Sequence, residues 1–311
     1  MYGYKKPSLG EVNLVYLVLG FALLIIGYLV QSKEIYSGLL ITEYIIILLP
    51  NILFLKLRGY ELKRVLRLNS ISFMQFIFIF LIMIFAYPVA IFLNAIFLAI
   101  INSFSSALPT SIPIPTTTIE YLIGLFVIAI APGICEEVMF RGTMMSAYDT
   151  LGYKKSILIT AILFGLFHFN IMNLIGPIFL GVILGFLVHK TNSIYASILG
   201  HTLNNAIALT IGVTITKFSD QINDMSNTTQ VYSDNTQMIM SLLVIGILAL
   251  ASSIILIVLI KKMPTNENLQ DTFDYSGIIF KQERFKILKY IPIIIIIATF
   301  LFLNIRMLFY V

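Results

Sequence analysis

The sequence has few charged residues and almost no cysteine. Only 11% of its 311 residues are charged, and Cys135 is the only cysteine. A single cysteine excludes an intramolecular disulfide framework and a zinc site built on cysteine ligands. The chain also lacks internal repeats and low-complexity segments.

Long apolar runs dominate the rest of the chain. Hydrophobic residues make up 59% of it, and the mean hydropathy is +0.97, a composition that no soluble domain has. The formal net charge of +5 does not indicate nucleic-acid binding, because Lys and Arg cluster in short segments between apolar runs. The composition predicts an all-α, polytopic transmembrane helical bundle, folded as a single membrane domain over residues 1–311.

The apolar runs predict eight or nine membrane spans. They lie at about 12–31, 36–57, 71–101, 119–148, 156–169, 173–190, 193–212, 236–261 and 288–309. The run at 156–169 is short, which leaves the ninth span open. The first run is too long for a signal peptide and has no small-residue cleavage site, so we expect a retained first helix.

Lys and Arg predict the orientation. Basic clusters alternate along the chain with connecting segments that lack them: 102–118 has no charge, and 213–235 has one lysine against three aspartates. Over nine spans every basic cluster falls on one side, which predicts a cytoplasmic N-terminus and an external C-terminus. The basic 56–67 segment is either amphipathic and on the cytoplasmic surface or a solvated loop. Richness in Ile, Lys and Asn indicates an AT-rich bacterial genome, hence a bacterial plasma membrane.

Three polar features interrupt the central apolar runs: EEVMFR (136–141), FGLFH (164–168) and HTLNN (201–205). Residues four apart share a helix face, so Glu137 can pair with Arg141, and His201 can act beside Asn205. Glu136 lies about 100° around the helix from Glu137 and is free to face elsewhere.

The depths of these residues agree. At ~1.5 Å per residue, Glu136, His168 and Asn205 lie ~18 Å from the ends of their spans nearest the basic segments, and His201 lies ~12 Å from its own. Taken singly, each feature has a simpler explanation, such as helix packing for a histidine or an interhelical hydrogen bond for Asn205. An acid, two imidazoles and an amide at one level are instead the groups needed to activate water and to hold an oxyanion.

The three segments resemble the EExxxR, FxxxH and HxxxN motifs of the CAAX-protease and bacteriocin-processing (Abi) family of intramembrane proteases. The resemblance covers a family-like catalytic core at 119–212 and implies a water-filled cavity inside a helical membrane domain. The roles it implies are Glu136 as the general base that activates water, helped by His168; His201 and Asn205 as oxyanion stabilisers; and Glu137 with Arg141 as a brace for Glu136.

The resemblance leaves the cofactor and the substrate open. Members are often called metalloproteases, and a glutamate with two histidines could ligate a divalent metal such as zinc. No HExxH motif is present, and we favour water activation without a metal. A prenylated CAAX tail and a peptide leader both suit the cytoplasm-facing cavity that we expect. The lipid bilayer is the other expected partner, and nucleic acid is not.

Two other functions stay in view. A bacteriocin self-immunity or membrane scaffold protein would keep the same motifs and fold with little proteolysis. A transporter or proton relay also places charged residues at mid-membrane, but usually has internal repeats and acids in several spans. Here the buried charge is concentrated in one helix, with Glu43 of the second run as the main exception. No serine-protease elbow or paired intramembrane aspartates are present, so other intramembrane protease classes fit poorly.

Overall fold

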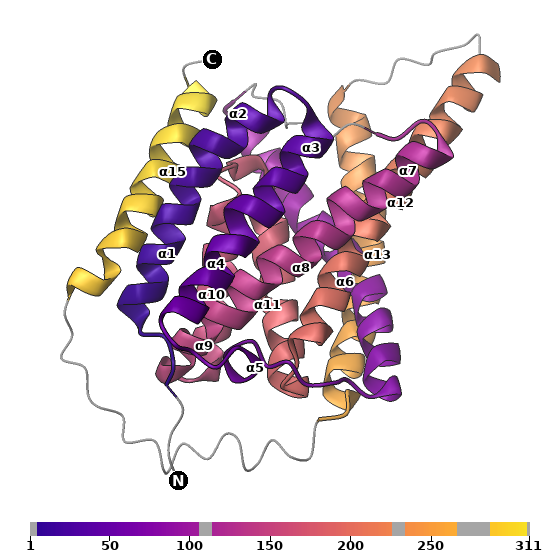
Figure 1. Cartoon of the computed structure of the whole chain (residues 1–311). Coiled ribbons are helices and arrows are strands. Elements are labelled where there is room, and N and C mark those ends of the chain that lie inside the picture. Colours follow the sequence, from indigo (N-terminus) through magenta and orange to yellow (C-terminus); the bar gives the residue numbers. More distant parts are fainter. Residues whose placement is uncertain (1–4, 106–113, 226–233, 266–286, 310–311) are drawn as a thin grey trace.

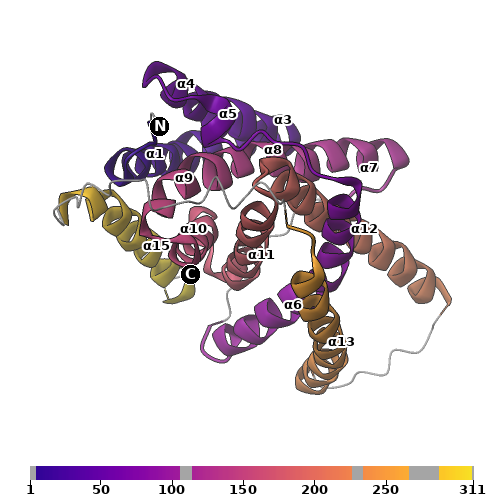
Figure 2. The same cartoon turned by 90° about the horizontal axis from the view of Figure 1, so that it is seen from below.

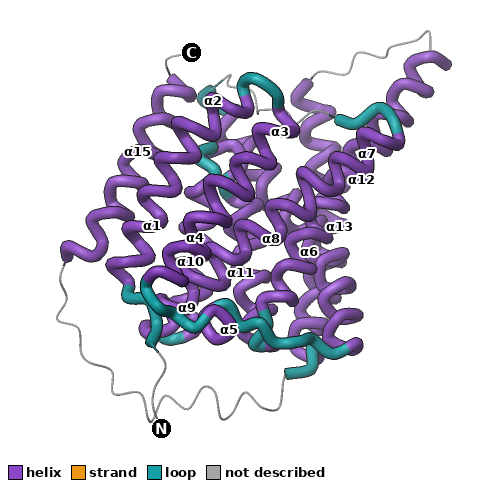
Figure 3. Tube along the Cα trace, in the orientation of Figure 1, coloured by secondary structure: helices purple, strands orange, loops and turns teal. Residues whose placement is uncertain are grey.

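The computed structural model describes residues 5–105, 114–225, 234–265 and 287–309, which are helical with no strand (Figures 1 and 3). Within these ranges eight helices are long and apolar enough to cross a membrane: Leu9–Gln31, Ile35–Leu57, Phe73–Asn102, Thr118–Leu151, Ile171–Thr191, Ile194–Phe218, Ile239–Lys262 and Ile287–Phe309. The predicted polytopic helical bundle is therefore confirmed.

Three spans pass from α-helix into short π-helical stretches. The first consists of α1 (Leu9–Ala22), η1 (Leu23–Gly27) and α2 (Tyr28–Gln31), and the second of α3 (Ile35–Leu40), η2 (Ile41–Leu48) and α4 (Leu49–Leu57). The fourth consists of α7 (Thr118–Gly124), η3 (Leu125–Ile130), α8 (Ala131–Glu137), η4 (Val138–Met144) and α9 (Met145–Tyr148). Because π-helical turns occur often at functional sites, it is notable that α8, which carries both central glutamates, has one on each side.

Side-chain caps determine where several helices begin. Ser8 and Glu11 form a capping box at the start of α1, and Ser72 and Gln75 form another at the start of α6 (Phe73–Asn102). The Thr117 side chain accepts a hydrogen bond from the backbone of α7. Each cap satisfies N–H groups that have no partner within the helix.

α10 (Tyr153–Phe167) and α11 (Ile175–Thr191) form a short hairpin. The predicted ninth span at 156–169 is too short to count as one, because the 15 residues of α10 rise only ~22 Å, against ~30 Å of hydrocarbon. Neighbouring spans hold the hairpin tip, residues 168–174. Asn94 Nδ2 donates to the Met172 carbonyl at 3.2 Å, and Asn304 Oδ1 accepts from Ile171 N at 2.7 Å.

The basic 56–67 segment is amphipathic, as one of the two alternatives predicted. It contains a short helix, α5 (Leu62–Val65), in which Val65 is buried while Lys63 and Arg64 are exposed. Val65 packs in one cluster with Tyr60 and with the buried Val138 of the fourth span. The segment therefore lies against the bundle.

The predicted 213–235 loop is shorter than expected. α12 (Ile194–Met225) continues as helix well beyond 212, and α13 (Asp234–Lys262) begins at Asp234. Polar residues in 213–225 predict a loop, but a helix that leaves an apolar environment can continue with polar side chains. Residues 226–233 lie outside the described residues.

An aromatic core joins the first span, the fourth span and α10. The Phe140 ring meets Tyr16, Phe164 and Phe167 edge to face, with centroids 6.2, 5.1 and 5.4 Å away. The buried Tyr16 hydroxyl donates to the Leu163 carbonyl at 2.8 Å, so its polar group is satisfied. Outside this core, α15 (Ile291–Phe309) lies along α1, and α13 lies along α6 on the other side of the bundle (Figure 2).

The basic segments gather at one end of the bundle, here named the basic end. Hydrogen bonds link them there, from Lys5 to Arg58, from Asn69 to Asn192 and from Gln75 to Pro264. The opposite end, named the far end, holds the connecting residues 32–34, 103–105 and 114–117. α1 begins at the basic end and α15 finishes at the far end (Figure 1). Eight spans alone would return the chain to the end where it began, so the short α10 provides the one further passage. The assignment of the basic end to the cytoplasm stays a prediction.

Candidate active site

α8 lies very close to α12 because of a glycine. A Cβ atom added to Gly133 would overlap the Thr202 hydroxyl and lie 3.1 Å from the Thr202 backbone nitrogen. Only a residue without a side chain permits that approach. The next turn of α8 consequently brings Glu136 and Glu137 against His201.

Glu137 is fully buried and its charge is paired. Its Oε1 accepts hydrogen bonds from Arg141 Nη1 at 2.8 Å and from His201 Nδ1 at 2.9 Å. Arg141 also donates to the Gly181 carbonyl at 3.2 Å, and its guanidinium lies 4.6 Å from the centre of the Phe164 ring. A buried ion of either sign is costly without a partner, so the predicted Glu137–Arg141 pair, now confirmed, explains why both charges can sit inside the bundle.

Glu136 faces the other way. It keeps 9% of its surface exposed, and its Oε2 lies 3.8 Å from His201 Nε2. His201 thus stands between the two glutamates, with Nδ1 on Glu137 and Nε2 towards Glu136. Because a carboxylate only accepts hydrogen bonds, Nδ1 is the nitrogen that carries a proton in the bond to Glu137.

His168 caps the end of α10 and is oriented by the same helix. Its Nδ1 lies 3.0 Å from the Phe164 carbonyl, which only accepts, so Nδ1 is protonated in this bond. The Phe164 ring is edge to face with both imidazoles, at 5.1 Å from His168 and 5.6 Å from His201. The phenylalanine of FGLFH therefore separates and orients the two histidines.

The Asn205 amide is partly committed to structure. Its Nδ2 donates to the Ile128 carbonyl at 3.0 Å, and its Oδ1 accepts from Asn204 Nδ2 at 3.1 Å. An amide NH₂ group has two donors, so one N–H is left for a ligand. The bond to Ile128 ties α12 to the fourth span next to the imidazoles.

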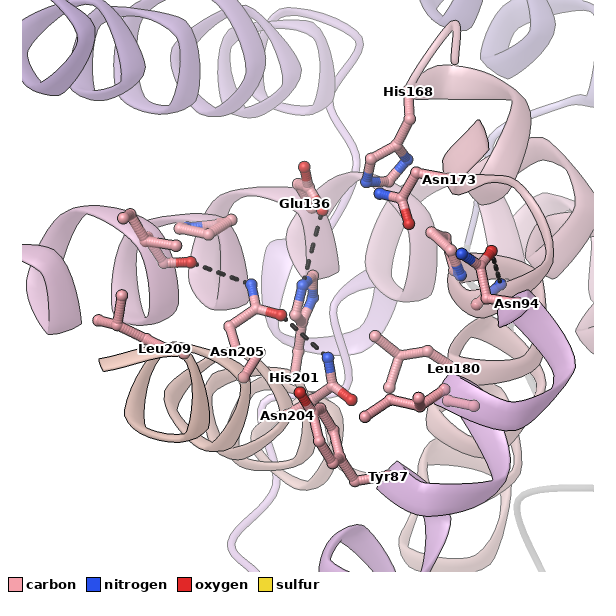
Figure 4. A pocket seen from close by; sticks show the side chains of 18 of the residues that line it. Tyr87, Asn94, Glu136, His168, Asn173, Leu180, His201, Asn204, Asn205 and Leu209 are labelled. Carbon is pink, nitrogen blue, oxygen red and sulfur yellow. Dashed lines mark hydrogen bonds and ion pairs between the residues drawn. The ribbon is translucent and has the colours of Figure 1, made fainter. Parts of the chain in front are cut away.

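Glu136, His168, His201 and Asn205 all line one cavity of about 630 Å³ (Figure 4). The four side chains therefore lie together, as their common depth predicted. Glu137 and Arg141 lie behind the wall, where they hold His201. The catalytic roles of all six residues stay predictions.

Five further polar residues of the wall were not among the predicted site residues: Glu43, Tyr87, Asn94, Asn173 and Asn204. Glu43 is only 6% exposed, and its buried Oε2 accepts no hydrogen bond. A signal for it was available, because Glu43 lies eight residues into its span, ~12 Å from the far end. No motif marks Asn173, whose position depends on how the α10–α11 hairpin folds.

The expectation that the cavity faces the basic end is wrong. Below Glu136, towards that end, Met83, Met139 and Leu184 are each 0% exposed and close the bundle. The lining residues lie on the far side of this layer, for example Leu39 near the start of α3 and Leu98 near the end of α6. The depth calculation correctly predicted that the four polar side chains lie together, but it could not show which side of them is closed by packing.

Glu136, His168 and His201 are the side chains that could ligate a metal. Among the described residues, no group of three or more His, Cys, Asp and Glu is gathered closely enough to hold a metal ion. Each histidine Nδ1 is hydrogen-bonded, one to Glu137 and the other to the Phe164 carbonyl, which leaves Nε2 of both rings for a ligand or for water. Water activation without a metal stays a prediction, and the steps proposed below are written with side chains and water.

The fold and the site together define a polytopic membrane protein with an acid–imidazole cavity inside its helical bundle. Residues 118–207 match the family model described as type II CAAX prenyl endopeptidase Rce1-like. This stretch runs from the fourth span into α12 and contains all six predicted site residues, which confirms the resemblance found in the sequence. No curated protein and no solved structure matches the chain.

Proposed function

We propose that this protein is an intramembrane endopeptidase in which Glu136 activates water to hydrolyse a peptide bond. The observation that carries the proposal is the position of Glu136: a carboxylate with some exposure, on the wall of a cavity that also holds both imidazoles. The match of residues 118–207 to an endopeptidase family supports it. The substrate is a peptide or a protein segment at the membrane.

The base acts first. Glu136 takes a proton from a water molecule, and the water oxygen attacks the carbonyl carbon of the scissile bond. His168, held through Nδ1, turns its other ring nitrogen towards the same cavity and orients the water. When the tetrahedral intermediate collapses, the proton on Glu136 passes to the leaving amine.

The oxyanion is held by donors from α12. His201 Nε2 and the remaining N–H of Asn205 are the donors. In that role Nε2 must carry a proton, so the ring is an imidazolium between Glu136 and Glu137. Glu137, fixed by Arg141, then holds the ring in one orientation, and preorganised donors of this kind supply a large part of catalysis.

The test is the variant Glu136→Gln, compared with Glu61→Gln, an exposed glutamate at the basic end. Membranes of a deletion strain complemented with each form would be analysed by peptide mass spectrometry, and a peptide cleaved by the wild type would be assayed with the purified proteins. We expect Glu136→Gln to fold normally and its cleavage rate to fall by about 10²–10⁴-fold, the usual contribution of a general base. Glu61→Gln should cleave normally.

Other outcomes would assign a different function. Identical peptide profiles for the deletion strain and the wild type would favour the immunity or scaffold role. Normal cleavage by Glu136→Gln would remove Glu136 as the base. Activity that a chelator abolishes and zinc restores would move the activation of water to a metal.

A further inference from the structure

The cavity opens from the level of the glutamates towards the far end. α6 and α12 meet at Gly200, where an added Cβ would lie 3.4 Å from Met83 Sδ and 2.8 Å from Leu184 Cδ2. Beyond this contact, α6 lines the cavity from Tyr87 to Leu98, and α12 lines it from His201 to Gly212. The two helix faces therefore enclose a space whose closed end is the packed layer around Met83 and Leu184.

The short α10–α11 hairpin leaves room on the open side. Its tip ends inside the bundle, and His168, Asn173 and Gly176 of this region line the cavity. The neighbouring α6 continues past Asn94, which holds the tip, to Asn102 at the far end. A hairpin long enough to cross the membrane would fill the volume between the tip and the far end. The short hairpin therefore leaves the cavity open towards the far end.

The distribution of Lys and Arg predicts which side of the membrane the cavity opens to. Lys and Arg gather in the connecting segments at the basic end, which is the cytoplasmic side by the usual bias of membrane proteins. We propose that the cavity receives its substrate from the extracytoplasmic half of the membrane, as an internal segment of a membrane-anchored peptide. That the occupant is a substrate rests on the proposed function, whereas the direction of access does not.

The charge of the wall favours an internal segment over a chain terminus. The wall contains two glutamates, Glu43 and Glu136, and no Lys or Arg among the described residues. Its one proposed cation, the imidazolium of His201, is already hydrogen-bonded to Glu137. A prenylated CAAX tail ends in a free carboxylate only three residues beyond the prenylated cysteine. Like charges in a site of low dielectric repel strongly, so such a tail would meet repulsion where an uncharged or cationic segment would not.

Cysteine accessibility tests the direction in intact cells. Three single cysteines would be placed in a Cys135→Ala background: Ala95→Cys in the cavity wall, Ser103→Cys at the far end and Ser70→Cys at the basic end. A membrane-impermeant maleimide would be applied to intact cells and to inverted membrane vesicles. We expect Ala95→Cys and Ser103→Cys to react in intact cells, and Ser70→Cys to react only in inverted vesicles.

Each other pattern would overturn the proposal. If Ser70→Cys reacts in intact cells, the orientation is reversed and the cavity opens to the cytoplasm. If Ala95→Cys reacts only in inverted vesicles, or on neither side, access from outside is wrong. Because labelling needs no hydrolysis, repeating it with Glu136→Gln separates a failure of this proposal from a failure of the proposed function.

The preference for an internal segment has its own measurement. Ala95→Cys would be modified with a cationic and with an anionic methanethiosulfonate of similar size, and each rate divided by that at Ser103→Cys. We expect the cationic reagent to be favoured by about tenfold, the lower range for charge focusing in a cleft. An anionic reagent that reacts as fast as the cationic one would overturn the exclusion of a terminal carboxylate.

Discussion

The two sides of α8 treat adjacent glutamates in opposite ways. On one side Glu137 is 0% exposed and is neutralised by Arg141 and His201 through two short hydrogen bonds. On the other side Glu136 is 9% exposed on the wall of a cavity, with His201 Nε2 at 3.8 Å. The helix rotates about 100° between them, which is enough to place one acid in protein and the next at the edge of water.

This difference shows two physical solutions to one problem. A carboxylate inside a membrane must be neutralised by a partner or reached by water, because burial of an isolated ion is costly. A carboxylate paired with a cation is held in place and is a poor base, whereas one on the wall of a cavity can accept a proton. We call the side of α8 that carries the paired Glu137 the structural side, and the side that carries Glu136 and faces the cavity the reactive side, after its proposed role. His201 contacts both acids and so links the two sides.

The largest effect should come from the reactive side. We expect His168→Ala to lower the cleavage rate by about 10²–10⁴, as Glu136→Gln does, because the imidazole and the carboxylate position one water. The measurement is single-turnover cleavage by the two single variants and the double variant. Residues that act as a unit show non-additive losses, so the double variant should be little worse than either single one.

Additive losses would show that His168 and Glu136 act in separate steps. A wild-type rate for His168→Ala would remove the histidine from the reactive side altogether. His189→Ala, which also removes an imidazole but lies outside the cavity lining, is the matched control and should leave the cleavage rate near that of the wild type.

The next effect concerns the structural side and appears in stability. Arg141→Ala leaves Glu137 buried without its cation, and loss of one partner of a buried pair costs about 3–5 kcal/mol. Thermal unfolding in detergent would measure the loss. Arg58→Ala, which breaks the exposed pair with Glu11, should cost only about 0–1 kcal/mol.

Normal stability of Arg141→Ala with loss of cleavage would break the comparison between the two sides of α8. It would mean that the arginine takes part in the reaction directly. Equal losses of stability for Arg141→Ala and Arg58→Ala would show that burial of the first pair contributes nothing special.

The sequence predicted the elements of the fold better than their ends. Apolar runs located every span, because about 20 apolar residues are needed to cross a bilayer. They left open whether α10 spans, because its apolar run stops short of the bilayer thickness, and they misjudged α12, whose helix continues with polar residues to Met225. The length and polarity of a segment do not show where neighbouring helices fix the end of a helix, as Asn94 and Asn304 do by hydrogen bonds to the hairpin tip.

The predicted site followed from local spacing and depth. Glu137 and Arg141 are four apart on one helix, so their pairing could be read directly, and common depth brought the histidines and Asn205 together. The contact of His201 with both glutamates depends on the close approach at Gly133, and the place of Glu43 depends on the packing of η2 against α8. Neither packing contact leaves a pattern within a single helix.

The smallest effect should be that of Asn205→Ala, which tests the boundary between the two sides. Removal of one oxyanion donor usually costs about 10²–10³ in rate, and we expect the lower value because one Asn205 N–H is already bound to the Ile128 carbonyl. Asn204→Ala, which removes only the amide that donates to Asn205 Oδ1, is the control and should lower the rate less. The readout is the rate constant for cleavage at saturating peptide, since an oxyanion donor acts on the transition state and leaves KM nearly unchanged. If Asn205→Ala raises KM at constant kcat, the amide binds the substrate main chain and His201 alone holds the oxyanion.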